Sequence, residues 1–130
     1  MIIMIGLCAC TSKINNSKAY TRNGLLYEIG SDLPFTGLVT GRSVREGYRR
    51  TPVTYKKQYK NGLLDGKSYF YYQNGKIESV EPYKKGEING VVVRYYENGQ
   101  MKARINFTEG LRGGGNGEIF WDEHGNRLKG

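Results

Sequence analysis

A spacing of 24 residues recurs along this chain of 130 residues and constrains its fold more than any other feature. The segment 59–66 (YKNGLLDG) aligns with 83–90 (YKKGEING), and 71–75 (YYQNG) aligns with 95–99 (YYENG) at the same distance. Phe107 begins a third copy. A fixed period of this length is typical of repeat architectures, in which each copy is one supersecondary unit stacked on its neighbours.

Two turn signals and two strand signals fill each period. Asn-Gly pairs favour two-residue hairpin turns, because both central residues of a type I′ turn need a positive φ. Short runs rich in Tyr, Phe and Val lie between the turns, and these residues favour strands. We therefore expect an all-β protein, an elongated single-layer antiparallel β-meander of tandem 24-residue hairpin repeats. Within the clean repeats, the Asn-Gly pairs are Asn61-Gly62, Asn74-Gly75, Asn89-Gly90 and Asn98-Gly99.

The repeats fill one domain, residues 20–130, with copies of unequal regularity. Glycine occurs 19 times, about twice the average usage, as a chain with many turns requires. The glycine-rich segment 113–117 holds about two extra positions and is expected to be a flexible turn. We expect a divergent first repeat at 20–41, an irregular insertion at 42–54, clean repeats at 55–106 and a divergent last repeat at 107–130.

The N-terminus has the layout of a processing signal. Residues 1–9 carry no charge, and a run this short suits the apolar core of a signal peptide better than a membrane span, which needs about 20 residues. The motif at 7–10 (LCAC) resembles the bacterial lipobox. That resemblance implies cleavage before Cys10 and acylation of Cys10, with palmitate as a typical acyl chain. An apolar tail or a first strand is the alternative.

The expected signal peptide covers residues 1–10 and places the start of the mature chain at Cys10. Residues 11–19, rich in Asn, Ser and Lys, are then expected to form a flexible spacer. Thr11 is not the Asp that retains many Gram-negative lipoproteins in the inner membrane. The expected location is the cell envelope, with the outer membrane or the cell surface favoured.

The clean repeats share the pattern Tyr-x-x-Gly-x-x-x-Gly-x-x-x-x-Tyr-Tyr-x-x-Gly. This pattern resembles the bacterial variant of the MORN (membrane occupation and recognition nexus) repeat, over about residues 23–41 and 53–128. The segment 33–37 (LPFTG) resembles the opening repeat of such proteins. The resemblance implies a twisted single-layer sheet. Bacterial members include antitoxin-like proteins and surface lipoproteins, and eukaryotic relatives are linked to membrane and protein binding.

The turn positions assign side chains to two faces of the expected sheet. If the Asn-Gly pairs after the double tyrosines close two-residue turns, Tyr72 pairs with Ile77 and Tyr96 with Met101, and side chains alternate from there. The packed face is then expected to carry Phe70, Tyr72, Ile77, Val92, Tyr96, Met101, Ala103 and Ile105, with Arg94 as the exception.

The other face would mix aromatic and charged side chains, including Glu78, Val80 and Val93. Tyr and Arg are frequent in interface hot spots, so we take this face as the candidate partner-binding surface. Cross-strand packing is the alternative role for its tyrosines. The candidate contact residues are Tyr69, Tyr71, Tyr95, Lys102 and Arg104.

Catalytic chemistry has no evident carrier in this sequence. His124 is the only histidine and lies in the expected last turn, while the acidic residues are spread over repeat positions. Both cysteines lie within the first ten residues, so neither a disulfide framework nor a metal cluster is expected. We therefore expect no enzymatic activity, no catalytic or metal-binding residue and no cofactor.

The net charge of +8 would suit an acidic protein, an anionic lipid surface near Lys56, Lys57 and Lys60, or simply a soluble surface. We expect no nucleic-acid partner, because an exported lipid-anchored protein rarely meets one. The leading hypothesis is a non-enzymatic, envelope-anchored binding module for an unknown protein or envelope component. The alternative is an immunity or antitoxin protein that neutralises a cognate toxin, and a hydrolase is the third and least favoured.

Overall fold

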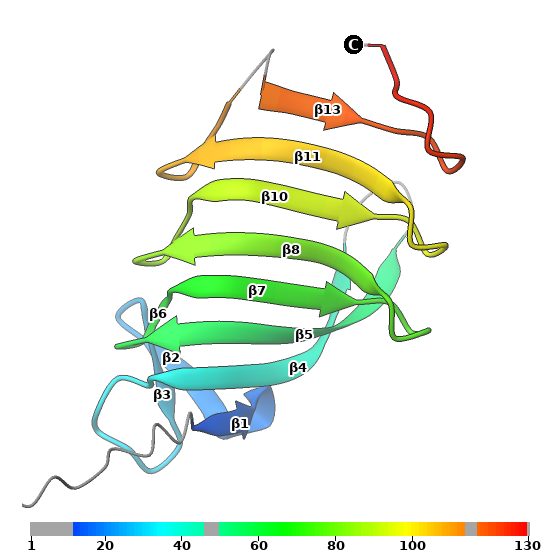
Figure 1. Ribbon diagram of the computed structural model, residues 1–130. Coiled ribbons are helices and arrows are strands. Elements are labelled where there is room, and N and C mark those ends of the chain that lie inside the picture. The colour runs from blue at the N-terminus through cyan, green and yellow to red at the C-terminus, as the bar shows by residue number, and fades with distance from the viewer. Residues whose placement is uncertain (1–11, 46–49, 114–116, 130) are drawn as a thin grey trace, which may run out of the picture.

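The computed structural model describes residues 12–45, 50–113 and 117–129, most of them in short strands (Figure 1). It confirms the expected all-β, mostly antiparallel meander. The strands are β1 (Lys13–Asn15), β2 (Ala19–Arg22), β3 (Leu25–Glu28), β4 (Gly37–Arg45), β5 (Thr51–Lys60), β6 (Leu63–Leu64), β7 (Gly66–Tyr71), β8 (Ile77–Lys84), β9 (Glu87–Ile88), β10 (Gly90–Tyr95), β11 (Met101–Thr108), β12 (Leu111–Arg112) and β13 (Glu118–Phe120), and η1 (Asn16–Lys18) is a 3-10 helix.

Within these residues, the strands form an 11-stranded sheet and a separate two-stranded sheet. The longer strands of the large sheet lie in the order β4-β5-β7-β8-β10-β11, so neighbours in the sheet are also neighbours along the chain (Figure 1). All of these pairs are antiparallel, and β13 continues the series beyond β11. The first edge differs, because β1 pairs with β4 in parallel.

Two-residue turns close one end of the repeats, which we call the tight-turn edge (left in Figure 1). Asn61-Gly62 joins β5 to β6 there with both residues at positive φ, so the predicted type I′ turn is confirmed. The equivalent turns place Lys85 and Glu109, not Asn, before the glycine. Asn89-Gly90, which the sequence predicts as a turn, instead links β9 to β10 along the edge.

Longer turns close the opposite end, which we call the wide-turn edge. After β7, the N–H of Gly75 donates to the carbonyl of Tyr72 at 3.0 Å, and the N–H of Tyr72 donates to the carbonyl of Lys76 at 2.9 Å. Gly75 has a positive φ, whereas Asn74 does not. This is a three-residue type I turn with a glycine bulge. The two-residue turns predicted at 74–75 and 98–99 are therefore wrong.

The longer turn shifts the strand register by one residue. Tyr71, and not Tyr72, pairs with Ile77, and Glu78 is left out of the pairing as a β-bulge. Paired residues point to the same side of a sheet, so Ile77 lies on the face of Tyr71 and not on the expected packed face. The same shift recurs in the next repeat, where Tyr95 pairs with Met101 and the unpaired residue is Lys102.

A second layer covers only the first strands of the sheet. The β2–β3 hairpin packs on one face of β4, β5 and β7 and completes the main hydrophobic core. A smaller buried cluster of Val92, Ala103 and Ile105 continues on the same face. The main core consists of Leu26, Phe35, Val39, Val53, Tyr55 and Phe70.

Residues 12–19 are structured, in contrast to the flexible spacer expected at 11–19. Lys13–Asn15 form β1, and Asn15 caps η1 by accepting a hydrogen bond from the N–H of Ser17 at 3.0 Å. Ile14 packs against the main core. A three-residue strand with one apolar side chain has no periodicity that would reveal it in the sequence. Thr11 lies outside the described residues.

Residues 42–54, expected to be an irregular insertion, contain the outer ends of β4 and β5. These ends stay paired as far as Arg45 and Thr51, and residues 46–49 lie outside the described part of the chain. They run past β7 and turn across the sheet on the side that β2–β3 also covers (Figure 1). As a result, Arg45 reaches side chains of β8, 34 and 36 positions further along the chain.

Each repeat is hydrogen-bonded to the next at both edges. At the tight-turn edge, the carboxylate of Asp65 accepts from the N–H of Lys85 at 3.2 Å. At the wide-turn edge, the Asn74 side-chain amide donates to the carbonyl of Glu97 at 3.2 Å. The equivalent bonds one repeat later join Asn89 to Glu109 at 3.3 Å and Asn98 to Glu123 at 2.9 Å.

The last repeat keeps its wide turn despite an altered spacing. The N–H of Gly125 donates to the carbonyl of Asp122, and the N–H of Asp122 donates to the carbonyl of Asn126. Asp122 therefore occupies the position of Tyr96, 26 residues earlier, and the two extra positions inferred from the sequence are confirmed.

Candidate interaction surfaces

One face of the large sheet carries rows of aromatic, β-branched and basic side chains, and we call it the open face. The strand register fixes these rows across β5, β7, β8, β10, β11 and β13. Its central side chains are half-buried rather than buried, apart from the exposed Lys56 and Arg104. The open face is formed by Lys56, Tyr69, Tyr71, Ile77, Val80, Val93, Tyr95, Met101, Arg104 and Ile119.

Four of the five candidate contact residues lie on the open face. Tyr69 and Tyr71 are stacked, with ring centres 6.5 Å apart and ring planes 21° from parallel. The ammonium nitrogen of Lys56 lies 5.4 Å from the centre of the Tyr71 ring, within the range of a cation–π contact. Tyr95 and Arg104 lie on the neighbouring strands β10 and β11.

Lys102 does not join the other four candidates. It is the unpaired residue of the second bulge, and its ammonium nitrogen lies 5.3 Å from the ring centre of Tyr96. Both side chains line a groove on the opposite face of the sheet. The one-residue register shift explains this difference from the sequence-based assignment, which also placed Glu78 on the wrong side.

The charge of the open face is basic. At the paired positions that share this face, the described strands carry several basic side chains and one acidic side chain, Glu87 of β9, which lies opposite Lys84. Near β4 and β5 the face is hollowed into a cavity of about 620 Å³ lined in part by Arg42, Lys56 and Tyr71. Its basic side chains include Arg42, Lys56, Lys67 and Arg104, with Lys60 and Lys84 toward the tight-turn edge.

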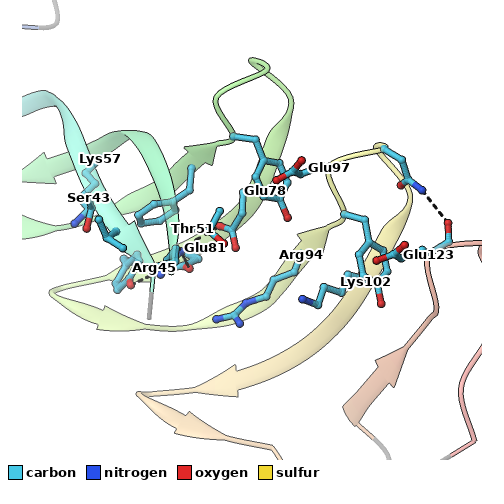
Figure 2. A pocket seen from close by; sticks show the side chains of 16 residues that line it. Ser43, Arg45, Thr51, Lys57, Glu78, Glu81, Arg94, Glu97, Lys102 and Glu123 are labelled. Carbon is cyan, nitrogen blue, oxygen red and sulfur yellow. Dashed lines mark hydrogen bonds and ion pairs between the residues drawn. The ribbon is translucent and has the colours of Figure 1, made fainter. Parts of the chain in front are cut away.

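The opposite face holds a groove of about 950 Å³ between the sheet and the outer ends of β4 and β5 (Figure 2). This face was expected to be packed, and Phe70, Val92, Ala103 and Ile105 are indeed buried in it. Beyond them, the groove is lined by charged and aromatic side chains. Its acidic residues are Glu78, Glu81, Glu97 and Glu123, its basic residues Arg45, Lys57, Arg94 and Lys102, and its aromatic residues Phe70, Tyr72, Tyr83 and Tyr96.

Arg45 organises one end of the groove. Its guanidinium donates to Ser79 Oγ at 2.9 Å and to the Glu81 carboxylate, and its Nε lies 3.5 Å from Glu78 Oε2. The guanidinium carbon lies 3.8 Å from the ring centre of Phe70. Glu81 is only 5% exposed, and a buried carboxylate of this kind needs such partners.

The burial of the groove side chains changes their proton affinity. Burial, with the neighbouring charge of Glu81, raises the pKa of Tyr83 to about 12, and the Tyr83 hydroxyl donates to Glu81 Oε2 at 3.0 Å. Burial likewise raises the pKa of Tyr72 to about 12. The pKa of Lys57 is lowered, first by burial and then by the positive charge of Arg45. The tyrosines therefore act as neutral hydrogen-bond donors at neutral pH.

Arg45 is the groove residue that the sequence did not reveal. It lies within the segment that interrupts the repeat, so no periodic position marked it, and its contacts depend on how the β4–β5 hairpin bends. Arg94, by contrast, was noted as the one charged residue of the expected packed face. Its place in the groove accounts for that exception.

The remaining candidate residues take ordinary positions or lie outside the described residues. His124 is exposed, and its backbone N–H donates to Asp122 Oδ1 within the last turn. The described residues contain no group of three His, Cys, Asp or Glu side chains placed to hold a metal ion. None of the helices in the described segments has the length and apolar character needed to span a membrane. Cys10 and the rest of the expected signal peptide lie outside the described residues.

Comparison with known proteins identifies the repeat. Residues 64–85 and 88–109 each match the family model described as the MORN repeat variant. The first segment starts at the end of β6 and the second at the end of β9. They correspond to the two most regular copies of the 24-residue period. Neither the curated proteins nor the solved structures include a match to this chain.

Proposed function

We propose that this chain, which carries two repeats of the MORN variant, is a non-enzymatic binding module that holds an acidic protein partner against its open face at the cell envelope. The observation that carries the proposal is the open face itself. Its half-buried tyrosine, valine, isoleucine and methionine side chains lie in continuous rows over five strands, β7, β8, β10, β11 and β13.

An apolar surface that spans several strands favours binding to a partner. Contiguous exposed apolar patches are uncommon on monomeric soluble proteins and mark interaction sites. Tyr69, Tyr71 and Tyr95 supply large rigid rings. Tyrosine is frequent among the few residues that dominate binding energy in protein interfaces. The stacking of Tyr69 on Tyr71 and the half-burial of all three rings hold them in place before a partner arrives, which reduces the entropy lost on binding.

The charge of the open face selects the partner. Arg42, Lys56, Lys67 and Arg104 surround the aromatic rows, whereas the carboxylate that the described strands place on this face, Glu87, lies opposite Lys84 at the tight-turn edge. A partner with an apolar patch and an acidic rim complements this pattern and is attracted to it over a distance.

The location follows from the lipobox-like motif. A diacylated Cys10 would form a stable membrane tether, because two acyl chains hold far more firmly than one. Two residues separate Cys10 from Lys13, where β1 begins, and the three Cα-to-Cα steps between them span about 11 Å at most. The first edge of the sheet would therefore lie close to the membrane surface, not at the end of a long spacer.

The open face can be tested by site-specific crosslinking in cells that express the full chain. A photo-crosslinking amino acid replaces Tyr71 or Tyr95 and, as the matched control, Leu33 or Leu128, which are 75% and 49% exposed but lie elsewhere. We expect one protein to be captured from both open-face positions and from neither control. Capture of the same proteins from all four positions would contradict the proposal.

A second experiment separates the anchor from the binding face. Labelled palmitate should enter the wild-type chain but not a Cys10→Ala variant, and label that persists in the variant would exclude Cys10 as the tether. The antitoxin alternative uses the same open face. It would be favoured if the captured partner proved toxic to cells that lack this chain.

A further inference from the structure

The groove contains the same niche twice, once in each clean repeat, and the two copies have opposite charge. The acidic niche consists of Phe70, Glu78, Ser79 and Glu81 on β7 and β8. The positions 24 residues later form the basic niche on β10 and β11, where the corresponding residues are Arg94, Lys102, Ala103 and Ile105. Both niches open into the same groove (Figure 2).

The acidic niche is occupied by the chain itself. Arg45, from the outer end of β4, lies over the Phe70 ring and contacts Glu78, Ser79 and Glu81. The side chain of Arg45 is only 28% exposed there. This niche therefore has a known occupant: one charged side chain of the opposite sign, delivered from the end of a bent β-hairpin.

The basic niche presents two cations without such an occupant. Arg94 and Lys102 are both exposed, and neither forms a hydrogen bond or an ion pair with another side chain of the described segments. Arg94 pairs with Ala103 in the sheet, so its side chain lies next to that of Lys102, and Figure 2 shows both pointing into the groove. Lys102 also lies against Tyr96.

We propose that the basic niche binds a single carboxylate side chain presented by a partner protein, as the acidic niche binds Arg45. The ligand follows from charge complementarity. Arg94 and Lys102 are two adjacent cations, and both can bind the same carboxylate. This surface lies opposite the open face and does not rest on the function proposed for that face. Ala103 and Ile105 of the niche are buried together with Val92, and this packing supports the strands that carry the two cations.

The rim of the groove restricts the kind of segment that can present this carboxylate. Glu97 and Glu123 also line it, at the wide-turn edge. A run of consecutive acidic residues would meet these carboxylates, whereas an isolated Glu between neutral residues would not. The suitable probe is therefore a short peptide with one Glu flanked by Gly, Ser and Thr, and its matched control has Gln at the same position.

The test is a peptide titration followed by the amide NMR signals of the full chain. We expect the Glu peptide to shift the signals of Arg94, Lys102 and Ala103 in a saturable way, and the Gln peptide to shift them at least tenfold more weakly. An Arg94→Gln/Lys102→Gln variant should lose the response. A Lys60→Gln/Lys84→Gln variant has the same loss of net charge at exposed positions outside the niche and should keep it.

A charge exchange makes the test stricter. Arg94→Phe/Lys102→Glu gives the second niche the side chains of the first at two positions, and we expect it to prefer an Arg peptide over the Glu peptide. Equal responses to the Glu and Gln peptides, or equal losses in both charge-removal variants, would overturn the proposal. So would binding to anionic phosphatidylglycerol vesicles that requires Arg94 and Lys102 while the Glu peptide fails to bind. A melting temperature several degrees lower in Arg94→Gln/Lys102→Gln would also overturn it, because the chain itself would then supply the anion.

Discussion

The hydroxyl of Tyr72 donates a 2.6 Å hydrogen bond to the backbone carbonyl of Tyr95, across the boundary between two repeats. The bond recurs one repeat later, where Tyr96 donates to the carbonyl of Trp121 at 2.8 Å. Successive repeats are therefore joined by side chains as well as by the backbone ladder of the sheet.

Replacement of Tyr72 by Phe removes this bond and leaves the ring in place. We expect the free energy of unfolding to fall by about 1 kcal/mol, the typical net value of one hydrogen bond. Urea denaturation followed by circular dichroism measures the change. The control is Tyr69→Phe, since no hydrogen bond joins the Tyr69 hydroxyl to the described residues. Equal losses in the two variants would argue against a specific role for the Tyr72 bond.

Replacement of Arg45 by Met should cost about 3 kcal/mol, because it leaves the buried carboxylate of Glu81 without its cation. Adding Glu81→Met to this variant should restore much of the loss, since both charges are then gone. The exposed Arg42 on the same strand provides the control, and Arg42→Met should change stability little. A double variant no more stable than Arg45→Met would mean that Arg45 acts through packing alone.

Alkaline pH should weaken the fold through Tyr72 and Tyr83. Their pKa of about 12 in the folded chain exceeds the unfolded value near 10, so folding favours the protonated hydroxyl. This contribution is complete below about pH 10 and is lost as the pH rises to about 12. Absorbance at 295 nm should show one late-titrating tyrosine fewer in Tyr83→Phe than in the wild type. An unchanged titration curve near pH 12 would exclude the shift.

Gly62 and Gly24 occupy the same position of two type I′ turns, with φ of +81° and +77°. Alanine at either site is strained by the positive φ, at about 1 kcal/mol. At Gly62 the added Cβ would also lie 2.9 Å from Leu25 Cβ, whereas at Gly24 it meets nothing within 4 Å. We expect Gly62→Ala to cost about 3 kcal/mol in all, given typical overpacking penalties. Thermal unfolding of both variants measures the difference, and equal losses would show that the contact relaxes freely.

The repeat period determined most of what could be predicted from the sequence. The recurrence from Tyr59 to Tyr83 and from Tyr71 to Tyr95 gave the strands, the meander and the shared face of Tyr69, Tyr71 and Tyr95. These features follow from local chemistry, since turns and alternating strands depend on neighbouring residues.

The register at the wide-turn edge could not be derived in the same way. Asn-Gly is compatible with a two-residue turn and with a three-residue turn that ends in glycine, and the two differ by one position in pairing. Other type I′ turns accept Lys85 and Glu109 at φ of 49° and 47°, so the Asn-Gly signal marked only some of the two-residue turns. This single ambiguity moved Lys102 and Glu78 to the other face.

The contacts of Arg45 could not be predicted from the neighbouring residues in the sequence, for a different reason. They depend on the bend of the β4–β5 hairpin over the sheet, which brings together residues from a non-repeated segment and from β8. Nothing in the spacing of the repeat indicates where such a segment will dock.

The bonds between repeats also affect how the chain reaches its fold. The hydrogen bonds from Asn74 to Glu97 and from Tyr72 to Tyr95 each span 23 positions, and the Arg45–Glu81 contact spans 36. These contacts join neighbouring or nearly neighbouring hairpins, and topologies built from nearby segments fold faster than those built from distant pairings. A chain emerging from its N-terminus can close the two-layered end first and then add one hairpin at a time, without waiting for its last residues.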